Sequence, residues 1–540
     1  MMNRRQMLQR TAAGLAAGAL PGCHTDTAAM IPGRMVDSGM DLGHHLRGPA
    51  LRETALPTPD ERRRARVVVA GGGIAGLAAC HALRSAGVRD VLLIDALAQA
   101  GGNSSCGENA VSAYPWGAHY VPLVRADSLP VLELFEELKI IIDRDSNGRP
   151  VYDELFLSAD PQERLWIYGR WESGLLPEVG SSPEDRAQFA RFSAETERLK
   201  SVRGDDGKPL FAIPIDDSSA DPQWRALDRV RLTDYLRSQG YTSARLYWYV
   251  NYCCRDDYGS LASEVSAWAG LHYFCARTGV AANADPGTVV TWPEGNGHLA
   301  RALLQRASPT LQLRSLVTRV ARAGAGVEVD YFDAATARSV RVIADTAVVC
   351  LPRFVAAHVV EAGPGLLIPT AVEFSYAPWM VANLTLSQLP GGPGQALAWD
   401  NVIYDSELLG YVVATHQSLA QRQRDTVITY YWPLTEHDPA ASRTLAAQRP
   451  LSEWQNTVAA DLLRVHPELR GHIENMDVRV WGHAMIRPTP GFIWGDARRD
   501  SLQQQPPIFF AHSDMSGISI FEEAYCRGRH AGQMAASALA

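Results

Sequence analysis

Lysine is scarce in this chain of 540 residues: only Lys139, Lys200 and Lys208 occur, so nearly all of the basic charge is arginine. Acidic residues outnumber basic ones, 59 to 51, and the formal net charge is −8. The chain therefore has no excess of positive charge for binding nucleic acid, and we expect no nucleic-acid partner. The eight cysteines are scattered and lack C-x-x-C spacing. We therefore expect neither a disulfide framework nor a metal site.

The first 23 residues are interpreted as a targeting signal rather than as part of the fold. Asn3-Arg4-Arg5-Gln6-Met7-Leu8 resembles a twin-arginine export signal, and the apolar stretch Ala12–Leu20 is too short to span a bilayer. Leu20-Pro21-Gly22-Cys23 resembles the lipobox of a bacterial lipoprotein, although Pro21 is unusual there. We expect export by the twin-arginine route to the periplasm or cell envelope, with Cys23 as the lipid anchor. Cleavage elsewhere, with a chance cysteine, is the alternative.

A strand–turn–helix–strand pattern follows. Arg66–Ala70 is β-branched and apolar, as in a parallel strand buried on both faces. Gly71-Gly72-Gly73-Ile74-Ala75-Gly76 forms a G-x-G-x-x-G before a small-residue helix that we expect from about Leu77 to Ser85. A second strand, Val91–Ile94, ends at Asp95. This order predicts a dinucleotide-binding βαβ unit.

Each part of the motif has a physical role. Gly71 makes the tight turn, Gly73 admits a pyrophosphate, and Gly76 lets the helix pack closely on the sheet. The N–H groups at the helix start, at Ile74 and Ala75, attract phosphate. Asp95 is positioned to accept hydrogen bonds from a ribose diol. The alternative is a doubly wound sheet without nucleotide, which would leave three consecutive glycines without a purpose.

The rest of the chain predicts an α/β protein with a doubly wound, Rossmann-like domain assembled from three segments and a second α+β domain. The second domain is expected to combine an antiparallel sheet with inserted helices. The expected divisions are a signal at 1–23, a tether at 24–64, nucleotide-binding parts at 65–120, 290–355 and 505–540, a helical insertion at 121–289 and an antiparallel sheet at 356–504.

This arrangement resembles the flavin-containing amine oxidase superfamily. The resemblance rests on the N-terminal fingerprint, on a second glycine loop at Gly101–Ser105, and on a C-terminal strand, Pro507–Ala511, followed by an acid, Gly517 and a small-residue helix. It implies FAD as the cofactor and hydride transfer from a small-molecule substrate to flavin N5. The electron acceptor is left open.

The resemblance also implies roles for single residues. Asp514 matches the family acid near the ribityl or pyrophosphate portion, and Val317 matches the adenine-contacting valine. The helix beginning near Ile520 would direct its positive end at the flavin pyrimidine. In the second glycine loop, Gly102, Asn103 and Ser104 stand where the family usually continues with arginine. Asn103 and Ser104 can donate hydrogen bonds but carry no charge.

One departure concerns the lysine that many family members place beside flavin N5. No lysine occurs after Lys208. The strand we align with that position, Trp379–Asn383, offers only Asn383. In the family this lysine holds a water molecule beside flavin N5. Either oxygen is therefore an inefficient electron acceptor here, or another residue holds that water molecule.

On the substrate side, His119 follows Gly117-Ala118 where the family loop passes the flavin, and a base or ring contact is as consistent with the sequence as a structural role. Trp379 and Tyr411 belong to a group of aromatic side chains whose ring faces can bind an amine substrate through cation–π contact. Packing in the hydrophobic core explains the presence of any single ring as well. Asp256 and Asp257 are interpreted mainly as capping or pairing with Arg255, with attraction of a cationic substrate as the alternative.

Three functions follow from the sequence. The first is oxidation of an amine C–N bond. The second is desaturation of a C–C bond in an apolar molecule, which the missing lysine and the expected anchor favour. The third is a non-catalytic flavoprotein that acts as a partner at the membrane surface.

Overall fold

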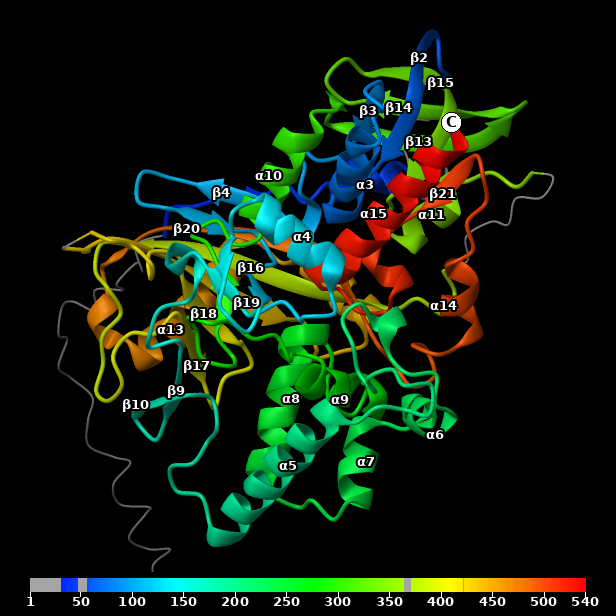
Figure 1. Ribbon diagram of the computed structural model, residues 1–540. Helices are drawn as coiled ribbons and strands as arrows, with labels where there is room; N and C mark the ends of the chain where they lie inside the picture. Colours follow the sequence, from blue (N-terminus) through cyan, green and yellow to red (C-terminus); the bar gives the residue numbers. More distant parts are fainter. Residues whose placement is uncertain (1–30, 47–55, 364–370, 421) are drawn as a thin grey trace, which may run out of the picture.

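The computed structural model describes residues 31–46, 56–363, 371–420 and 422–540. The chain folds around two large sheets (Figure 1). The first has the order β12-β3-β2-β15-β14-β13, with β21 paired to β15. Its strands are β2 (Glu61–Ala70), β3 (Val91–Ile94), β12 (Thr310–Gln312), β13 (Ser315–Ala323), β14 (Gly326–Asp333), β15 (Arg338–Val349) and β21 (Ile508–Phe510). Three separate parts of the chain therefore build one sheet, as the sequence predicted.

The second sheet has the order β1-β20-β16-β19-β18-β17-β9-β10 and is mainly antiparallel. Its strands are β1 (Met35–Val36), β9 (Glu163–Ile167), β10 (Arg170–Ser173), β16 (Tyr376–Leu386), β17 (Asp400–Ile403), β18 (Gly410–Val413), β19 (Thr426–Pro433) and β20 (Ile473–Ile486). Three short two-stranded antiparallel sheets pair β4 (Cys106–Glu108) with β5 (Ala113–Pro115), β6 (Tyr120–Pro122) with β11 (Val289–Thr291) and β7 (Ile141–Arg144) with β8 (Pro150–Tyr152).

Helices cover both sheets and form a separate group at the bottom of Figure 1. That group contains α5 (Pro183–Ser201), α6 (Pro222–Arg225), α7 (Leu232–Ser238), α8 (Ala244–Tyr258) and α9 (Ala267–Cys275). The others are α2 (Met40–Gly43), α3 (Ile74–Ser85), α4 (Leu129–Glu137), α10 (Gly297–Ala307), α11 (Arg353–Val359), α12 (Pro439–Gln448), α13 (Leu451–Val465), α14 (Asp496–Ser501) and α15 (Phe521–Ala538).

The C-terminal helix α15 lies side by side with α3 (Figure 1). Two glycines permit this contact: a Cβ at Gly528 would lie 2.0 Å from Ala75 O, and one at Gly532 would lie 2.5 Å from Ala79 O. The small side chains along both helices thus let the end of the chain pack against its first glycine-rich turn. This contact brings the start of α15 back toward the center of the molecule.

Three differences from the sequence expectation concern local structure. The segment expected as a tether contributes β1, whose pairing with β20 is parallel, and β2 begins at Glu61 rather than Arg66. The segment 121–289, expected to be a helical insertion, contains β7 to β10, and β9 and β10 extend the second sheet. Helix α4 ends at Glu137, because Lys139 adopts a left-handed φ of 61° before β7.

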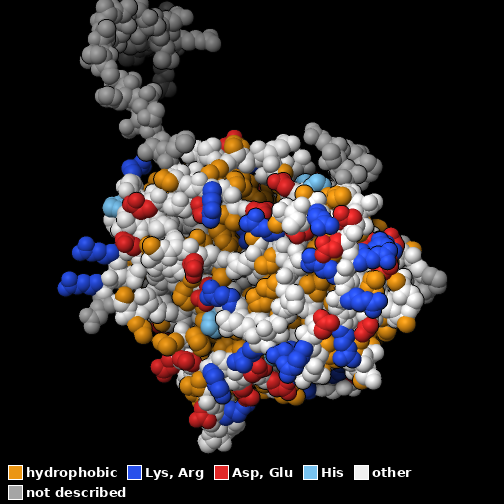
Figure 2. Space-filling view, turned by 90° about the horizontal axis from the view of Figure 1, so that it is seen from above, with side chains coloured by type: hydrophobic (Ala, Val, Ile, Leu, Met, Phe, Trp, Pro, Cys, Tyr) orange, Lys and Arg blue, Asp and Glu red, His pale blue; other side chains and the backbone are white. Residues whose placement is uncertain are grey.

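Acidic and basic side chains are interspersed over the face shown in Figure 2. Within the described ranges, no helix combines the length and apolar character needed to cross a membrane. The expected signal and Cys23 lie outside the described residues.

Candidate cofactor and substrate site

The glycine-rich turn after β2 is shaped by close backbone approaches. Gly71 has a φ of +100°, and a Cβ there would lie 2.5 Å from Cys350 O. A Cβ at Gly76 would lie 1.9 Å from Gly71 O. Gly73 is different, because a Cβ at that position meets no described atom within 4 Å. The motif therefore needs Gly71 and Gly76 for its own fold and leaves open space at Gly73.

The turn leads directly into α3, whose first residues are Ile74 and Ala75. No side chain among the described residues caps this helix start. The N–H groups of its first turn are thus available to an anion, with the helix dipole in support.

Asp95 lies where β3 ends and is tied to the same turn. Its Oδ2 accepts a hydrogen bond from the Gly72 N–H at 2.6 Å, and its Oδ1 accepts one from the Leu97 N–H at 2.7 Å. Burial raises the pKa of Asp95, although these hydrogen bonds and the charge of Arg479 oppose the shift. Each carboxylate oxygen retains a second lone pair that can accept from a hydroxyl group.

The second glycine loop touches the first. A Cβ at Gly102 would lie 3.2 Å from Gly73 Cα. The Asn103 side chain donates to Ala484 O at 2.5 Å, and Ser104 is buried. The two loops therefore form one continuous backbone surface beside α3.

A positively charged side chain that the sequence did not predict lies beside the second glycine loop. Arg479 on β20 is buried and donates from Nη1 to Ser105 Oγ at 2.9 Å, while its guanidinium lies 4.0 Å from the Trp481 ring centroid. Burial lowers its pKa to about 10, with Asp37 and Asp95 opposing. Its Nε has no hydrogen-bond partner among the described residues. Arginine charge is thus present beside the loop whose own position 103 is uncharged, and no local sequence signal links the two.

Asp514 follows β21 and is fully buried. Its Oδ2 accepts from the Arg353 N–H and from the Tyr376 hydroxyl, both at 2.7 Å. Burial opposes ionisation, but His512 and these hydrogen bonds lower the pKa of Asp514. The carboxylate therefore links α11 and β16 to the end of β21. Val317 is buried on β13 at the start of a β-bulge.

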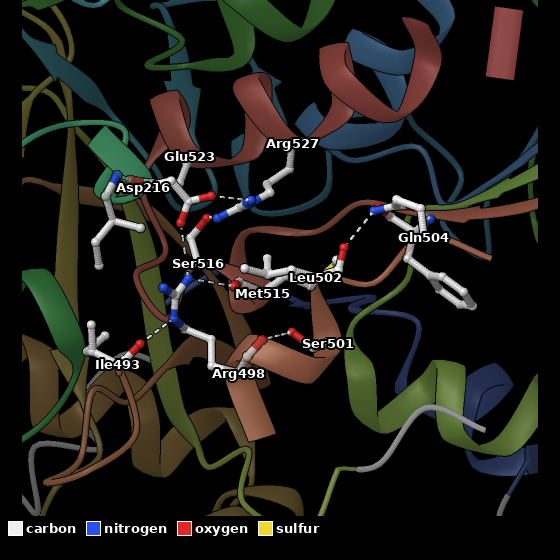
Figure 3. Close-up of polar contacts among 12 residues, drawn as sticks. Asp216, Ile493, Arg498, Ser501, Leu502, Gln504, Met515, Ser516, Glu523 and Arg527 are labelled. Carbon is white, nitrogen blue, oxygen red and sulfur yellow. Dashed lines mark hydrogen bonds and ion pairs between the residues drawn. The ribbon is translucent and has the colours of Figure 1, made fainter. Parts of the chain in front are cut away.

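A network of ion pairs and hydrogen bonds positions the start of α15 (Figure 3). Arg527 pairs with Asp216 at 2.7 Å and donates to Ser516 Oγ at 2.8 Å. Arg498 donates to Met515 O at 3.1 Å. These contacts fix the turn before α15, whose first residues face a cavity.

We call this first cavity the inner cavity; its volume is about 130 Å³. It is lined from α15 and the preceding turn by Ser519, Ile520, Phe521 and Glu522, from the second glycine loop by Asn103, from the following loop by Gly117, Ala118, His119 and Tyr120, and from the sheet by Trp379, Val381, Tyr431, Trp481, Ala484 and Met485. Two buried atoms at its wall, Trp379 Nε1 and Asn296 Oδ1, have no hydrogen-bond partner among the described residues.

His119 lies at one end of the inner cavity. Its ring stacks on Tyr431 with centroids 4.6 Å apart, and its Nδ1 lies 3.3 Å from Gly117 O. The Tyr431 hydroxyl donates to the same carbonyl at 2.9 Å. Burial lowers the pKa of His119 to about 4, so the imidazole is neutral at pH 7.

A second cavity, of about 710 Å³, shares His119, Tyr120, Asp256, Arg277 and Tyr431 with the first. We call it the acidic cavity, because its wall includes Glu163, Asp256 and Asp400. Aromatic rings also line it: Tyr252, Tyr273, Phe274, Trp399 and Tyr411.

The structure brings some of the expected catalytic residues together and separates others. His119 and Trp379 line the inner cavity. Tyr411 lines the acidic cavity, but its hydroxyl already contacts His466 Nε2 at 2.7 Å and Arg164 Nη2 at 3.2 Å. Asn383 lines neither cavity: its amide donates to Pro115 O at 3.0 Å and accepts from Thr429 Oγ1 at 2.7 Å.

Trp379 and Val381 line the inner cavity from β16, whereas Asn383 lies two residues further along the same strand, where contacts with Pro115 and Thr429 engage its amide. The pairing expected near Arg255 also differs. Asp257 forms its ion pair with Arg277, whereas Arg255 donates to Glu407 O. Asp256 is left facing both cavities.

Comparisons with known proteins agree with this architecture. Residues 69–138 match the family model described as an NAD(P)-binding Rossmann-like domain. No curated protein sequence matches the chain.

Solved structures are similar over most of the chain. A triple mutant of putrescine oxidase has a TM-score of 0.60 at 15% identity, covering 88% of this chain and 99% of that one. Cyclohexylamine oxidase from Brevibacterium oxydans IH-35A has a TM-score of 0.61 at 14% identity, covering 88% and 100%. A putative protoporphyrinogen oxidase from Exiguobacterium sp. 255-15 has a TM-score of 0.58 at 14% identity, covering 89% and 100%. The predicted fold class is thus confirmed: the chain is a mixed α/β protein with a Rossmann-like domain and the two-domain fold of the FAD-dependent oxidases.

Proposed function

We propose that this protein is an FAD-dependent oxidoreductase that oxidises the C–N bond of an amine. The observation that carries the proposal is the inner cavity, which is lined by the start of α15 and by the second sheet and adjoins a cavity with an acidic wall. Proteins with the same fold include a putrescine oxidase and a cyclohexylamine oxidase.

The residues present suit FAD. Open space at Gly73, beside the uncapped start of α3, suits a pyrophosphate, and Asp95 has lone pairs for a ribose. The unpartnered Trp379 Nε1 and Asn296 Oδ1 offer a donor and an acceptor to a polar ring edge. Arg479, Gly102, Asn103 and Ser104 would hold the middle of the cofactor, with Ile520 at the ring end.

When bound, the isoalloxazine ring supplies the acceptor for a hydride, which leaves the substrate carbon with its electron pair. The substrate becomes an iminium ion, which water hydrolyses to a carbonyl compound and an ammonium ion. The chain's own residues bind and orient the amine and remove its ammonium proton first.

Asp256 is suited to accept that proton because it faces both cavities. Burial and the neighbouring Asp257 raise its pKa to about 7, against the attraction of Arg277. His119 and Tyr431, stacked on each other, present an uncharged wall to the substrate carbon. Glu163, the remaining charged group that acts on Asp256, also raises its pKa.

Anaerobic titration of the purified full-length protein with a panel of amines tests the proposal. We expect oxidised flavin absorbance near 450 nm to bleach with an amine and to stay unchanged with the corresponding alcohol. Bleaching by apolar C–C substrates alone would contradict amine oxidation and support the desaturase. Bound flavin that neither class reduces would support a non-catalytic partner.

The desaturase alternative has one structural argument. Apart from Asp256, Asp257, Arg277 and Glu522, the inner cavity is lined by uncharged side chains, with Trp379 and Trp481 among its walls. A protein of the same fold is a putative protoporphyrinogen oxidase. The acidic cavity beside it is the reason we prefer an amine, since carboxylates disfavour an apolar substrate.

We further propose that the protein reaches the cell envelope by the twin-arginine route and is anchored through a lipid on Cys23. The proposal rests on the sequence of residues 3–23. Mass spectrometry of the mature N-terminus tests it: a diacylglyceryl group on Cys23 supports the anchor, and an unmodified or differently cleaved terminus contradicts it.

A further inference from the structure

Glu522 is a buried acid that borders two cavities and that the steps of the proposed amine oxidation do not use. It belongs to the first turn of α15, and 4% of its surface is exposed. It lines the inner cavity, and it also lines a third cavity of about 10 Å³, together with Arg125 and Ser128. The side chain therefore adjoins both the space assigned to the flavin and a separate small space.

The charged groups around Glu522 leave its carboxyl group without an ionic partner. Arg277 is the cation that lines the same two cavities, but its ion pair is with Asp257. Asp256 and Asp257, at the end of α8, line the inner cavity, and Glu523 follows on α15. Glu522 forms no ion pair with a described residue, and its own backbone N–H donates to its carboxyl group.

This environment favours the protonated form of the Glu522 side chain. Burial raises its pKa to about 7, and the charges of Glu523 and Asp257 add to the shift. The backbone hydrogen bond and the charge of Arg277 oppose it. The carboxyl group can therefore give up and regain a proton near neutral pH.

The third cavity has the size and the chemistry to hold one water molecule. A buried water needs about 10–15 Å³ and at least two polar partners. Ser128 Oγ, at the wall of this cavity, is buried and has no hydrogen-bond partner among the described residues. Arg125, at the same wall, pairs at 2.8 Å with Asp127, whose side chain is 53% exposed. A water molecule between Ser128 and Glu522 would satisfy the hydroxyl group and carry a proton to the acid.

The start of α15 determines which edge of a flavin ring would face Glu522. No side chain among the described residues caps this helix at Ile520, so the N–H groups of its first turn, apart from that of Glu522, can donate to a ligand. The hydrogen-bond acceptors of an isoalloxazine ring are on its pyrimidine half and at N5, whereas its dimethylbenzene edge has none. Asn296 Oδ1, buried and unpartnered at the wall of the inner cavity, can accept from the ring N–H of that pyrimidine half. We therefore expect N1, on the pyrimidine half, beside the turn that carries Glu522.

We propose that Glu522 protonates N1 of the reduced flavin, so that this protein holds its reduced cofactor in the neutral form. A hydride brings two electrons and one proton to N5 and leaves one negative charge on the ring. Transfer of the Glu522 proton to N1 cancels that charge and leaves a carboxylate, which regains a proton from water in the third cavity. The dipole of α15 alone would favour the anionic ring, so the acid reverses the preference of the helix. This inference rests on the proposed FAD cofactor and not on the choice of an amine as substrate.

Chemical reduction without substrate tests the assignment. The full-length protein is loaded with ¹⁵N-labelled FAD and reduced anaerobically with dithionite, and the ¹⁵N chemical shift of N1 is followed as a function of pH. This shift differs between a protonated and an anionic N1. We expect N1 of the parent protein to carry its proton at pH 7 and to lose it only at higher pH.

Two neighbouring acids provide the variant and its matched control. Glu522→Gln keeps the size of the side chain and removes the acid, so we expect the variant to fold and to bind FAD. Its N1 should lose the proton at least tenfold more readily, at a pH at least one unit lower than in the parent. Glu523→Gln is the control, because Glu523 is a buried acid of the same turn that does not line the inner cavity. Its acceptance from the Ile215 N–H at 2.6 Å can pass to the amide oxygen of the glutamine, and N1 should titrate as in the parent.

The outcomes separate this assignment from the proposed function. An anionic N1 in the parent at pH 7 would overturn the role of Glu522 and leave FAD-dependent amine oxidation standing. The same N1 titration in the parent and in Glu522→Gln would also overturn it, as would an equal change in Glu522→Gln and Glu523→Gln. A parent protein that binds no FAD would overturn both the assignment and the proposed function.

Discussion

Substitution of Gly73 separates cofactor binding from folding. Gly73 has φ −70° and ψ −177°, an extended conformation that any residue adopts. A Cβ there meets no described atom within 4 Å. Gly73→Ala should therefore stabilise the protein without cofactor by about 0.4–1 kcal/mol, because it restricts the unfolded chain.

Gly73→Leu carries the larger perturbation. Its side chain would fill the space that we assign to the pyrophosphate and displace about two hydrogen bonds to charged oxygen, each contributing about 1.5–3 kcal/mol. The expected loss is about 3–6 kcal/mol, or roughly 10²- to 10⁴-fold in the FAD dissociation constant. Neighbouring Gly76→Ala is the contrasting control: its Cβ would lie 1.9 Å from Gly71 O, so it should impair folding itself.

The assay combines FAD titration of the stripped protein, followed by quenching of flavin fluorescence, with urea unfolding of the same samples. Gly73→Leu should unfold at the urea concentration of the parent or above it, with strongly weakened FAD binding. Undiminished FAD affinity in a folded Gly73→Leu protein would refute the assignment of this space to the pyrophosphate.

Further predictions concern single side chains. Arg479→Gln should weaken FAD binding by roughly 10- to 100-fold, the equivalent of about 1.5–3 kcal/mol for a lost charged hydrogen bond, whereas the exposed Arg34→Gln should not change the FAD dissociation constant. Gly528→Val should lower the free energy of unfolding by about 1–3 kcal/mol or more, because its Cβ would lie 2.0 Å from Ala75 O; equal urea midpoints would contradict the packing of α15 on α3. His272 is buried and its pKa is lowered to about 4 by burial, so the native state binds fewer protons than the unfolded state, and stability is lost as pH falls from about 6.5 toward 4. His272→Gln should remove up to about 3 kcal/mol of that loss, measured by urea unfolding at pH 7 and pH 4.5. If the free energy of unfolding of the variant depends on pH as that of the parent does, His272 is not a neutral buried histidine.

Local patterns predicted the strand–turn–helix–strand unit that begins at β2. The β-branched run before Gly71, the glycine spacing and Asp95 all lie within 30 residues, and each acts through its immediate neighbours in the structure. The return of the chain at residues 508–538 was also visible, because a buried strand followed by a small-residue helix is distinctive.

The positions of the residues around the inner and acidic cavities and the second glycine loop depend on contacts between segments far apart in the chain, which local sequence patterns do not reveal. Glu163 and Asp400 are neighbours only because β9, in a region interpreted as helical, pairs with β17. Arg479 reaches Ser105 across 374 residues. Asn383, which the aligned strand offered, instead forms hydrogen bonds with Pro115 on β5 and Thr429 on β19. Pairing between distant segments decided these positions.

The central claim is that the glycine-lined turn after β2 and the start of α15 together hold FAD. The visible absorption spectrum of the purified protein, before and after incubation with excess FAD and gel filtration, tests it most directly. We predict bands near 370 and 450 nm with about one flavin per chain. A colourless protein that stays colourless after incubation with FAD would contradict the account.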